Sequence, residues 1–174
     1  MANHFYVDES RAHKGPYLLI ATKIETSSSA LIRKELKTFL NKGQKRIHFT
    51  NESDGRRKQI LAVISNLEIS CSIYSCSNKK DIEARYRCIN ALFQDTGPSG
   101  ISRVVMEARE SQDHRDLKWF KESRRFESHH IVLAHSLPRT EPLLWIPDAI
   151  GWAYGRGNPW REMVSSGIEK VIEV

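Results

Sequence analysis

The sequence has no apolar run that approaches the roughly 18 residues a membrane-spanning helix needs. It also has no internal repeat and no low-complexity stretch, and its start shows no secretory signal. Its three cysteines, Cys71, Cys76 and Cys88, form no Cys-x-x-Cys pair and are odd in number. They therefore argue against zinc and against a disulfide framework. We expect free, buried thiols in a cytoplasmic protein that has no membrane contact.

The length and composition predict a single globular domain. The chain has 174 residues, of which 40% are hydrophobic and 28% are charged. This length is enough for one domain with a substantial core and short for two. Because no linker interrupts the sequence, we expect one domain over residues 1–174.

Positive charge is concentrated in one segment. Residues 33–58 contain nine Lys or Arg against three acids, an excess equal to the +6 net charge of the whole chain. A local basic field of this kind attracts polyanions, so a nucleic-acid partner is expected. The candidate contact residues are Lys42, Lys45, Arg46, Arg56, Arg57 and Lys58. A solvated helix face followed by a lysine-rich loop would explain the same residues without a ligand.

The order of hydrophobic patterns predicts an α/β fold. Residues 4–8 and 17–24 read as a strand hairpin, and the second strand is apolar on both faces, as a central strand is. Further strands are expected at 68–77, 101–107 and 129–137, and the strand at 68–77 reads as half-buried. Residues 45–50 read as a short strand or an extended segment. Helices are expected at 26–43, 55–67, 81–93, 114–125 and 147–157, with a last one at 158–172. This order predicts a mixed sheet flanked by helices.

Three acids stand at the border of apolar segments. Asp8 ends the first strand, Glu107 ends the strand at 101–107, and Asp148 lies in the first turn of an otherwise apolar helix. A carboxylate is costly to bury unless it is paired or bound to a cation. Salt bridges to nearby arginines could explain Asp8 and Glu107, and the helix dipole could explain Asp148.

Together these three acids predict a metal site. Strand ends converge at one edge of a mixed sheet, and a helix packed across that edge can present its first turn there. Carboxylate oxygens suit Mg²⁺ or Mn²⁺. One or two such ions would support phosphodiester hydrolysis in RNA or DNA. Asp8, Glu107 and Asp148 are therefore the candidate catalytic and metal-binding residues.

The same segments carry a resemblance to a known family. "FYVDES" before a hairpin, "VVMEAR", and "LLWIPDAIGWAYG" resemble a bacterial family of RNase H-like proteins, the domain-of-unknown-function 3800 family. The resemblance spans residues 6–155 and implies an RNase H-like fold with Asp8, Glu107 and Asp148 as metal ligands. Trp145 and Pro147 stand where the family has Gln and Ala, and "KRIHF" lacks an acid that the family often has there. The hairpin after the first strand favours this fold over a PIN-type nuclease.

Three further residues have secondary roles in this hypothesis. Glu9 follows Asp8 directly, so in a strand it points to the opposite face. His48 could carry a proton or contact a phosphate, or it could be a packed edge residue. Arg109 could contact a phosphate or form an ion pair with the carboxylates.

A non-catalytic module is the alternative hypothesis. In that case the fold is kept, the metal site is eroded, and the basic segment binds nucleic acid or a protein. The aromatic residues that cluster late in the chain, including Trp145, Trp152 and Trp160, leave room for a homodimer.

Overall fold

A computed structural model describes residues 2–11, 15–97, 100–123 and 130–174. Part of the hairpin loop (12–14) and parts of the segments expected at 114–125 and 129–137 lie outside the described residues. The strands are β1 (Asn3–Arg11), β2 (Tyr17–Glu25), β3 (Ser70–Cys76), β4 (Ile101–Glu107), β5 (Val132–Ser136) and β6 (Ile168–Glu173). The α-helices are α1 (Ser29–Lys37), α2 (Asp54–Ser65), α3 (Asp81–Thr96), α4 (Glu110–Ser123) and α5 (Trp145–Arg156). Short 3₁₀ helices cover Phe49–Asn51 (η1), Pro142–Leu144 (η2) and Glu162–Gly167 (η3).

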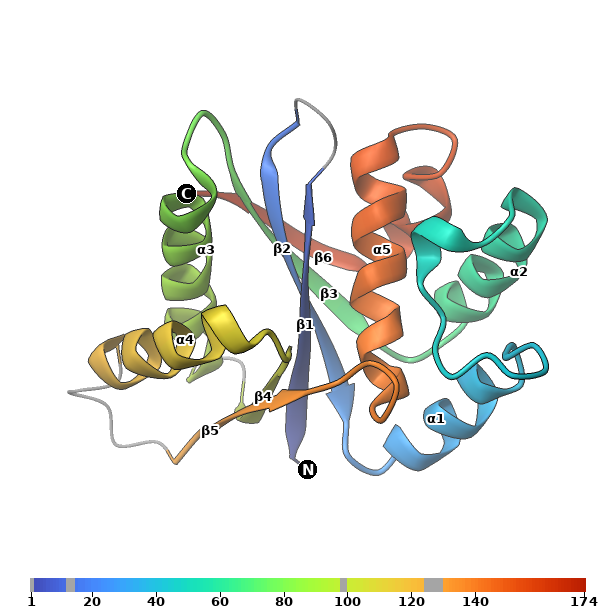
Figure 1. Ribbon diagram of the computed structural model, residues 1–174, viewed down its shortest axis with the longest axis horizontal. Coiled ribbons are helices and arrows are strands. Elements are labelled where there is room, and N and C mark those ends of the chain that lie inside the picture. The colour runs from blue at the N-terminus through green and yellow to red at the C-terminus, as the bar shows by residue number, and fades with distance from the viewer. Residues whose placement is uncertain (1, 12–14, 98–99, 124–129) are drawn as a thin grey trace.

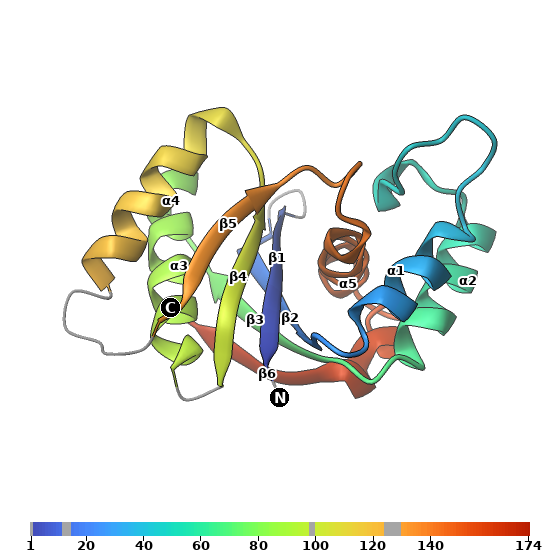
Figure 2. The same cartoon turned by 90° about the horizontal axis from the view of Figure 1, so that it is seen from below.

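All six strands form one mixed sheet in the order β5-β4-β1-β2-β3-β6. The first three strands are antiparallel neighbours, whereas β4 is parallel to both β1 and β5, and β6 is parallel to β3. Helices α1, α2 and α5 cover one face of the sheet and α3 and α4 cover the other (Figures 1 and 2). The predicted mixed α/β sheet flanked by helices is confirmed.

The core is divided by the sheet into two hydrophobic layers. Alternate residues of β2 enter opposite layers: Leu18 and Ile20 pack toward α5, whereas Leu19 and Ala21 pack toward α3. Strand β2 is buried on both faces and paired on both edges, which confirms its predicted central place. This rigid centre supports the residues at the end of β1.

The end of the chain differs from its prediction. A last helix over 158–172 is wrong, because the chain forms η3 and then β6. The β-branched residues Ile168, Val171 and Ile172 suit a strand, and the free edge of β3 offers the backbone partners that β6 uses. The half-buried character expected of β3 is also wrong, since β6 covers that edge and six of the seven β3 residues are buried.

The segment at 45–50 is not a strand. It is irregular and ends in η1, with Ile47 and Phe49 buried in the layer that contains α5. All three cysteines are free and buried, as predicted. Within the described ranges, the helices are too short or too polar to span a lipid bilayer.

Candidate functional site

The register of two parallel strands brings Asp8 and Glu107 together. Val7 of β1 pairs with Met106 of β4, and each acid is the next residue of its strand. Neighbouring residues at the same level of a parallel pair point to the same face. Asp8 and Glu107 therefore share the face that α5 covers.

Helix α5 adds the third acid, and its close approach depends on Gly151. A Cβ atom at Gly151 would lie 2.6 Å from Ile20 Cδ1 and 3.0 Å from Ser10 Cβ, so only glycine lets the helix pack this closely on β1 and β2. Asp148, one turn earlier, accepts a hydrogen bond of 3.0 Å from the backbone N–H of Phe49. The helix and the 45–50 segment are thereby joined at the site.

The three acids line one open cavity of about 580 Å³. Its wall also contains residues of β1, the 45–50 segment, the end of β4 and the exposed side of α5. They are Asp8, Glu9, Ser10, Arg11, Arg46, His48, Thr50, Glu107, Arg109, Asp148, Trp152, Gly155 and Arg156. All six residues to which the sequence assigns a carboxylate-site or secondary role, together with Arg46, therefore line this cavity.

The carboxylates are in an unfavourable environment without a cation. Asp8 is only 8% exposed, and burial together with the charges of Asp148 and Glu107 raises its pKa well above the usual range. Burial also raises the pKa of Asp148, against the opposing effects of the Phe49 hydrogen bond and of His48 and Arg46. The buried Nδ1 of His48 has no hydrogen-bond partner among the described residues. The site therefore combines like charges with unused polar atoms.

Two arginines partly neutralise these acids. Arg109 Nη2 lies 3.8 Å from Asp8 Oδ1 and 3.7 Å from Glu107 Oε2. Arg46 Nη1 lies 3.6 Å from Glu107 Oε1. These separations permit ion pairing but are longer than the 2.7–2.9 Å typical of charge-assisted hydrogen bonds. The carboxylate oxygens thus keep the capacity to bind another cation.

Glu9 belongs to a different set of contacts. It faces the other layer, as predicted, and accepts hydrogen bonds from Tyr17 Oη and Arg85 Nη1. It also forms an ion pair with Arg109 Nη1. Arg85 in turn makes a two-pronged contact with Asp116, of 3.2 Å from Nε and 2.8 Å from Nη2. These contacts leave Glu9 occupied and unavailable as a fourth ligand in this arrangement.

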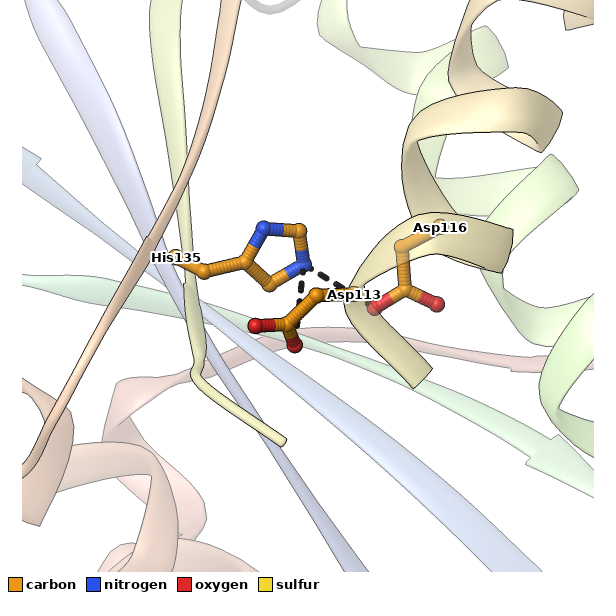
Figure 3. A group of neighbouring side chains, drawn as sticks. All are labelled: Asp113, Asp116 and His135. Atoms are coloured by element: carbon orange, nitrogen blue, oxygen red, sulfur yellow. Dashed lines mark hydrogen bonds and ion pairs between the residues drawn. The ribbon is translucent and has the colours of Figure 1, made fainter. Parts of the chain in front are cut away.

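A second acidic group lies beyond Arg85. Among the described residues, the group whose possible metal-ligating atoms all fall within 4.8 Å of one another is Asp113, Asp116 and His135. His135 Nε2 of β5 lies between the two acids of α4, 3.1 Å from Asp116 and 3.6 Å from Asp113 (Figure 3). Asp8, Glu107 and Asp148 are more widely spread than this. Proximity alone would therefore favour the second group as a metal site.

The hydrogen bonds and ion pairs of the two groups favour the opposite choice, the acids at the cavity. Burial alone would raise the pKa of Asp116, but hydrogen bonds from His135 and Arg85 outweigh burial and lower this pKa below its usual value. The carboxylate of Asp116 is therefore already stabilised as an anion. Asp113 accepts a hydrogen bond of 2.7 Å from the backbone N–H of Arg109. At the cavity, Asp8 and Asp148 each accept one backbone N–H, from Glu9 at 2.7 Å and from Phe49 at 3.0 Å. The arginine contacts of Asp8 and Glu107 are longer, at 3.6–3.8 Å, so these carboxylates still offer hard oxygen ligands to the cavity. The residues that fit a divalent cation are Asp8, Glu107 and Asp148.

The predicted nucleic-acid contacts divide into two classes. Lys42, Lys45 and Lys58 are exposed, and Arg46 lies in the cavity wall. Arg56 is bound to Glu52 and to the Phe39 carbonyl. Arg57 donates to the carbonyl of Phe49 and to Asp54, and its guanidinium lies 4.4 Å from the centre of the Trp152 ring. These last two side chains stabilise the fold around the site, and nucleic-acid binding by all six residues stays a prediction.

Sequence reasoning missed the place of Trp152 in the cavity wall and the role of Arg85. Trp152 lies four residues after Asp148 and therefore on the same side of α5, where it packs edge-on against Phe49 and Trp160. Helical spacing from Asp148 was a signal that could have found it. Arg85 had no such signal, because its partners come from β1, β2 and α4.

One of the comparisons with known proteins bears on the fold. A search of solved structures finds a similar chain in the PCNA:RNase HII complex from Archaeoglobus fulgidus, in the RNase HII component. The TM-score is 0.61 at 13% identity, over 94% of this chain and 77% of that one. No protein-family model matches the sequence, and no curated protein matches it significantly. The fold is therefore RNase H-like, as the resemblance implied, and the low identity shows the fold alone.

Proposed function

We propose that the protein is a divalent-metal-dependent nuclease that hydrolyses phosphodiester bonds in RNA or DNA. The observation that carries this proposal is the buried carboxylate of Asp8 on a central strand, with Glu107 and Asp148 beside it in one open cavity. The RNase H-like fold supports the same class of activity. The order of the three acidic segments supports membership of the domain-of-unknown-function 3800 family.

The charged residues and the histidine at the centre of the cavity have definite tasks in this proposal. Asp8, Glu107 and Asp148 would hold Mg²⁺ or Mn²⁺, which when bound activates water and stabilises the leaving oxygen. The guanidinium of Arg46 and the ring of His48 line the cavity, where they can bind the phosphate and fix its orientation. Glu9 holds Arg109 in place from the other face.

The surface beside the cavity suits a nucleic-acid backbone. Arg46 and Arg156 line the cavity, and Lys42 and Lys45 are exposed in the segment that leads to it. Neutralising phosphates releases counterions, so binding should weaken as salt rises. In the variant Lys42→Gln/Lys45→Gln, the slope of log affinity against log salt should fall by about 1–2 relative to wild type. An unchanged slope in fluorescence-anisotropy titrations would show that the nucleic-acid backbone does not contact Lys42 and Lys45.

The decisive assay is cleavage of labelled nucleic acids by the purified protein with Mg²⁺, Mn²⁺ or EDTA. The substrates are single- and double-stranded RNA and DNA and an RNA–DNA hybrid. Wild type should cut at least one of them in a metal-dependent way, and Asp8→Asn, Glu107→Gln and Asp148→Asn should each fold and lose at least about 100-fold in rate.

The matched control for this assay is Glu83→Gln. It removes an exposed acid of α3 that pairs with Lys79 and Arg87 away from the cavity, so its rate should equal that of wild type. Absence of metal-dependent cleavage of every substrate, or equal cutting by the three site variants and wild type, would refute the proposal.

A non-catalytic binding module is the second candidate. The favouring observation is that Arg109 and Arg46 already pair with the carboxylates, as salt bridges do in an eroded site. This alternative predicts salt-sensitive nucleic-acid binding that EDTA does not change and that Asp8→Asn leaves intact. The predicted homodimer stays a prediction. Trp145 does not bear on it, because Trp145 is buried in the core and its ring N–H donates to the Pro138 carbonyl.

A further inference from the structure

We propose that Arg109 occupies the position of a cation between Asp8 and Glu107, and that its ion pair with Glu9 allows it to yield this position to a divalent ion. The inference rests on the proposed metal site and adds a residue that controls its occupancy. It assigns to Arg109 the role of a competing counter-ion, with Glu9 as the residue that positions it.

The guanidinium of Arg109 is divided between two faces of the sheet. Its Nη1 forms the close ion pair with Glu9. Its Nη2 lies almost equally far from Asp8 Oδ1, at 3.8 Å, and from Glu107 Oε2, at 3.7 Å. One end of the group is therefore in contact with Glu9, and the other end lies beyond hydrogen-bonding distance of both acids. This second end is the one between the proposed metal ligands.

The backbone of Arg109 is held by hydrogen bonds, whereas its side chain is partly exposed. Its N–H donates to Asp113 Oδ1 at 2.7 Å, and the preceding Ala108 N–H donates to the Ser136 carbonyl at 2.9 Å. The side chain is 41% exposed and lines the cavity. A small rotation of the guanidinium about its contact with Glu9 would withdraw Nη2 from the acids without moving the strand or the helix.

Glu9 is built to keep its end of the contact. Tyr17 and Arg85 donate hydrogen bonds to its carboxylate, and the two-pronged contact with Asp116 fixes Arg85. Glu9 therefore stays in place whether or not Arg109 contacts the other two acids.

The consequence is competition. A divalent ion on Asp8 and Glu107 and the Nη2 group between them repel each other, so each must weaken the binding of the other to the same extent. Removing the charge of Arg109 should therefore tighten binding of the ion. Arg46 provides a comparison, because it carries the same charge and contacts Glu107 but has no ion pair with Asp8.

The test is calorimetric titration of the full chain with Mn²⁺ and, separately, the rise in melting temperature that Mn²⁺ causes. Arg109→Gln should bind Mn²⁺ about tenfold more tightly than wild type and show a larger rise in melting temperature. Arg46→Gln should gain no more than about threefold. Arg87→Gln, which removes an exposed charge of α3, should bind as wild type does.

The outcomes separate this inference from the proposed function. If wild type binds no Mn²⁺ at millimolar concentration, the metal site and this inference both fail. If wild type binds Mn²⁺ and Arg109→Gln gains no affinity, or gains no more than Arg46→Gln, Arg109 is not the competing counter-ion although the metal site stands.

Discussion

Two acidic groups lie on opposite sides of β1 and differ in how their charges are satisfied. Asp113 and Asp116 lie close to His135 and Arg85, and every acid there has a strong donor. Asp8, Glu107 and Asp148 are farther apart and face a cavity, and their arginine contacts are long. The acids of the first group have charged or histidine partners within hydrogen-bonding distance or short backbone donors. In the second group Asp8 and Asp148 accept backbone N–H groups, but the arginines that the structure describes beside Asp8 and Glu107 stay beyond hydrogen-bonding distance. A structural cluster is distinguished from a candidate metal site by the short hydrogen bonds and ion pairs that its carboxylates receive, and not by how close the carboxylates lie to one another.

The largest effect should come from breaking the satisfied group. Arg85→Met leaves the fully buried Asp116 and the carboxylate of Glu9 without their main partner. Loss of one member of a buried pair costs about 3–5 kcal/mol, so the free energy of unfolding in urea should fall by that amount. Arg87→Met, two residues along the same helix and exposed, should change it by less than about 0.5 kcal/mol. Similar losses in the two variants would show that the Arg85 contacts do not stabilise the fold.

A smaller effect is expected where α5 meets the strands. Gly151→Ala places a methyl group 2.6 Å from Ile20 Cδ1, and such overpacking costs about 1–3 kcal/mol. The methyl group also meets Ser10 Cβ at 3.0 Å, so we expect α5 to shift together with Ile20, which moves Asp148 and should weaken Mn²⁺ binding. The control is Gly55→Ala, at an open position of α2, which should leave Mn²⁺ binding unchanged and stabilise by about 0.5–1 kcal/mol. Unchanged Mn²⁺ binding in Gly151→Ala would show that the close packing of α5 at Gly151 is not needed to position Asp148 for the metal.

The smallest effect should appear when one unsatisfied charge is removed. Asp8 has a folded-state pKa above its unfolded value of about 3.9, so its ionisation destabilises the fold. This penalty is absent below the unfolded pKa and grows as pH rises through the interval up to the folded pKa. Asp8→Asn should therefore melt at a higher temperature than wild type without metal, by a margin that widens from pH 4 toward neutral pH. A margin independent of pH in thermal melts would contradict this explanation.

The sequence was sufficient to predict a mixed sheet flanked by helices and the three carboxylates that line the cavity. The hairpin and the alternation of strands with helices follow from local hydrophobic patterns, and strand ends in a mixed sheet converge by geometry. Asp8, Glu107 and Asp148 could be selected because each is an acid next to apolar residues.

The missed features depend on contacts between distant segments. Arg85 looks like any polar helix residue until β1, β2 and α4 surround it. The pattern of residues 168–173 permits a strand, but only the free edge of β3 selects it. Arg56 and Arg57 looked free to bind phosphate, and the structure shows both bound to nearby carbonyl groups. Sequence patterns indicate which face of a helix or strand is buried, whereas the partners of a charged side chain are known only once the distant segments are packed together.

The most direct test of the central claim is the anomalous difference map of a crystal soaked in Mn²⁺. We expect a peak bound by Asp8, Glu107 and Asp148, with Arg109 Nη2 displaced from Asp8, and no peak at Asp113, Asp116 and His135. A peak only at the second group, or the absence of any peak at Asp8 under saturating Mn²⁺, would contradict it.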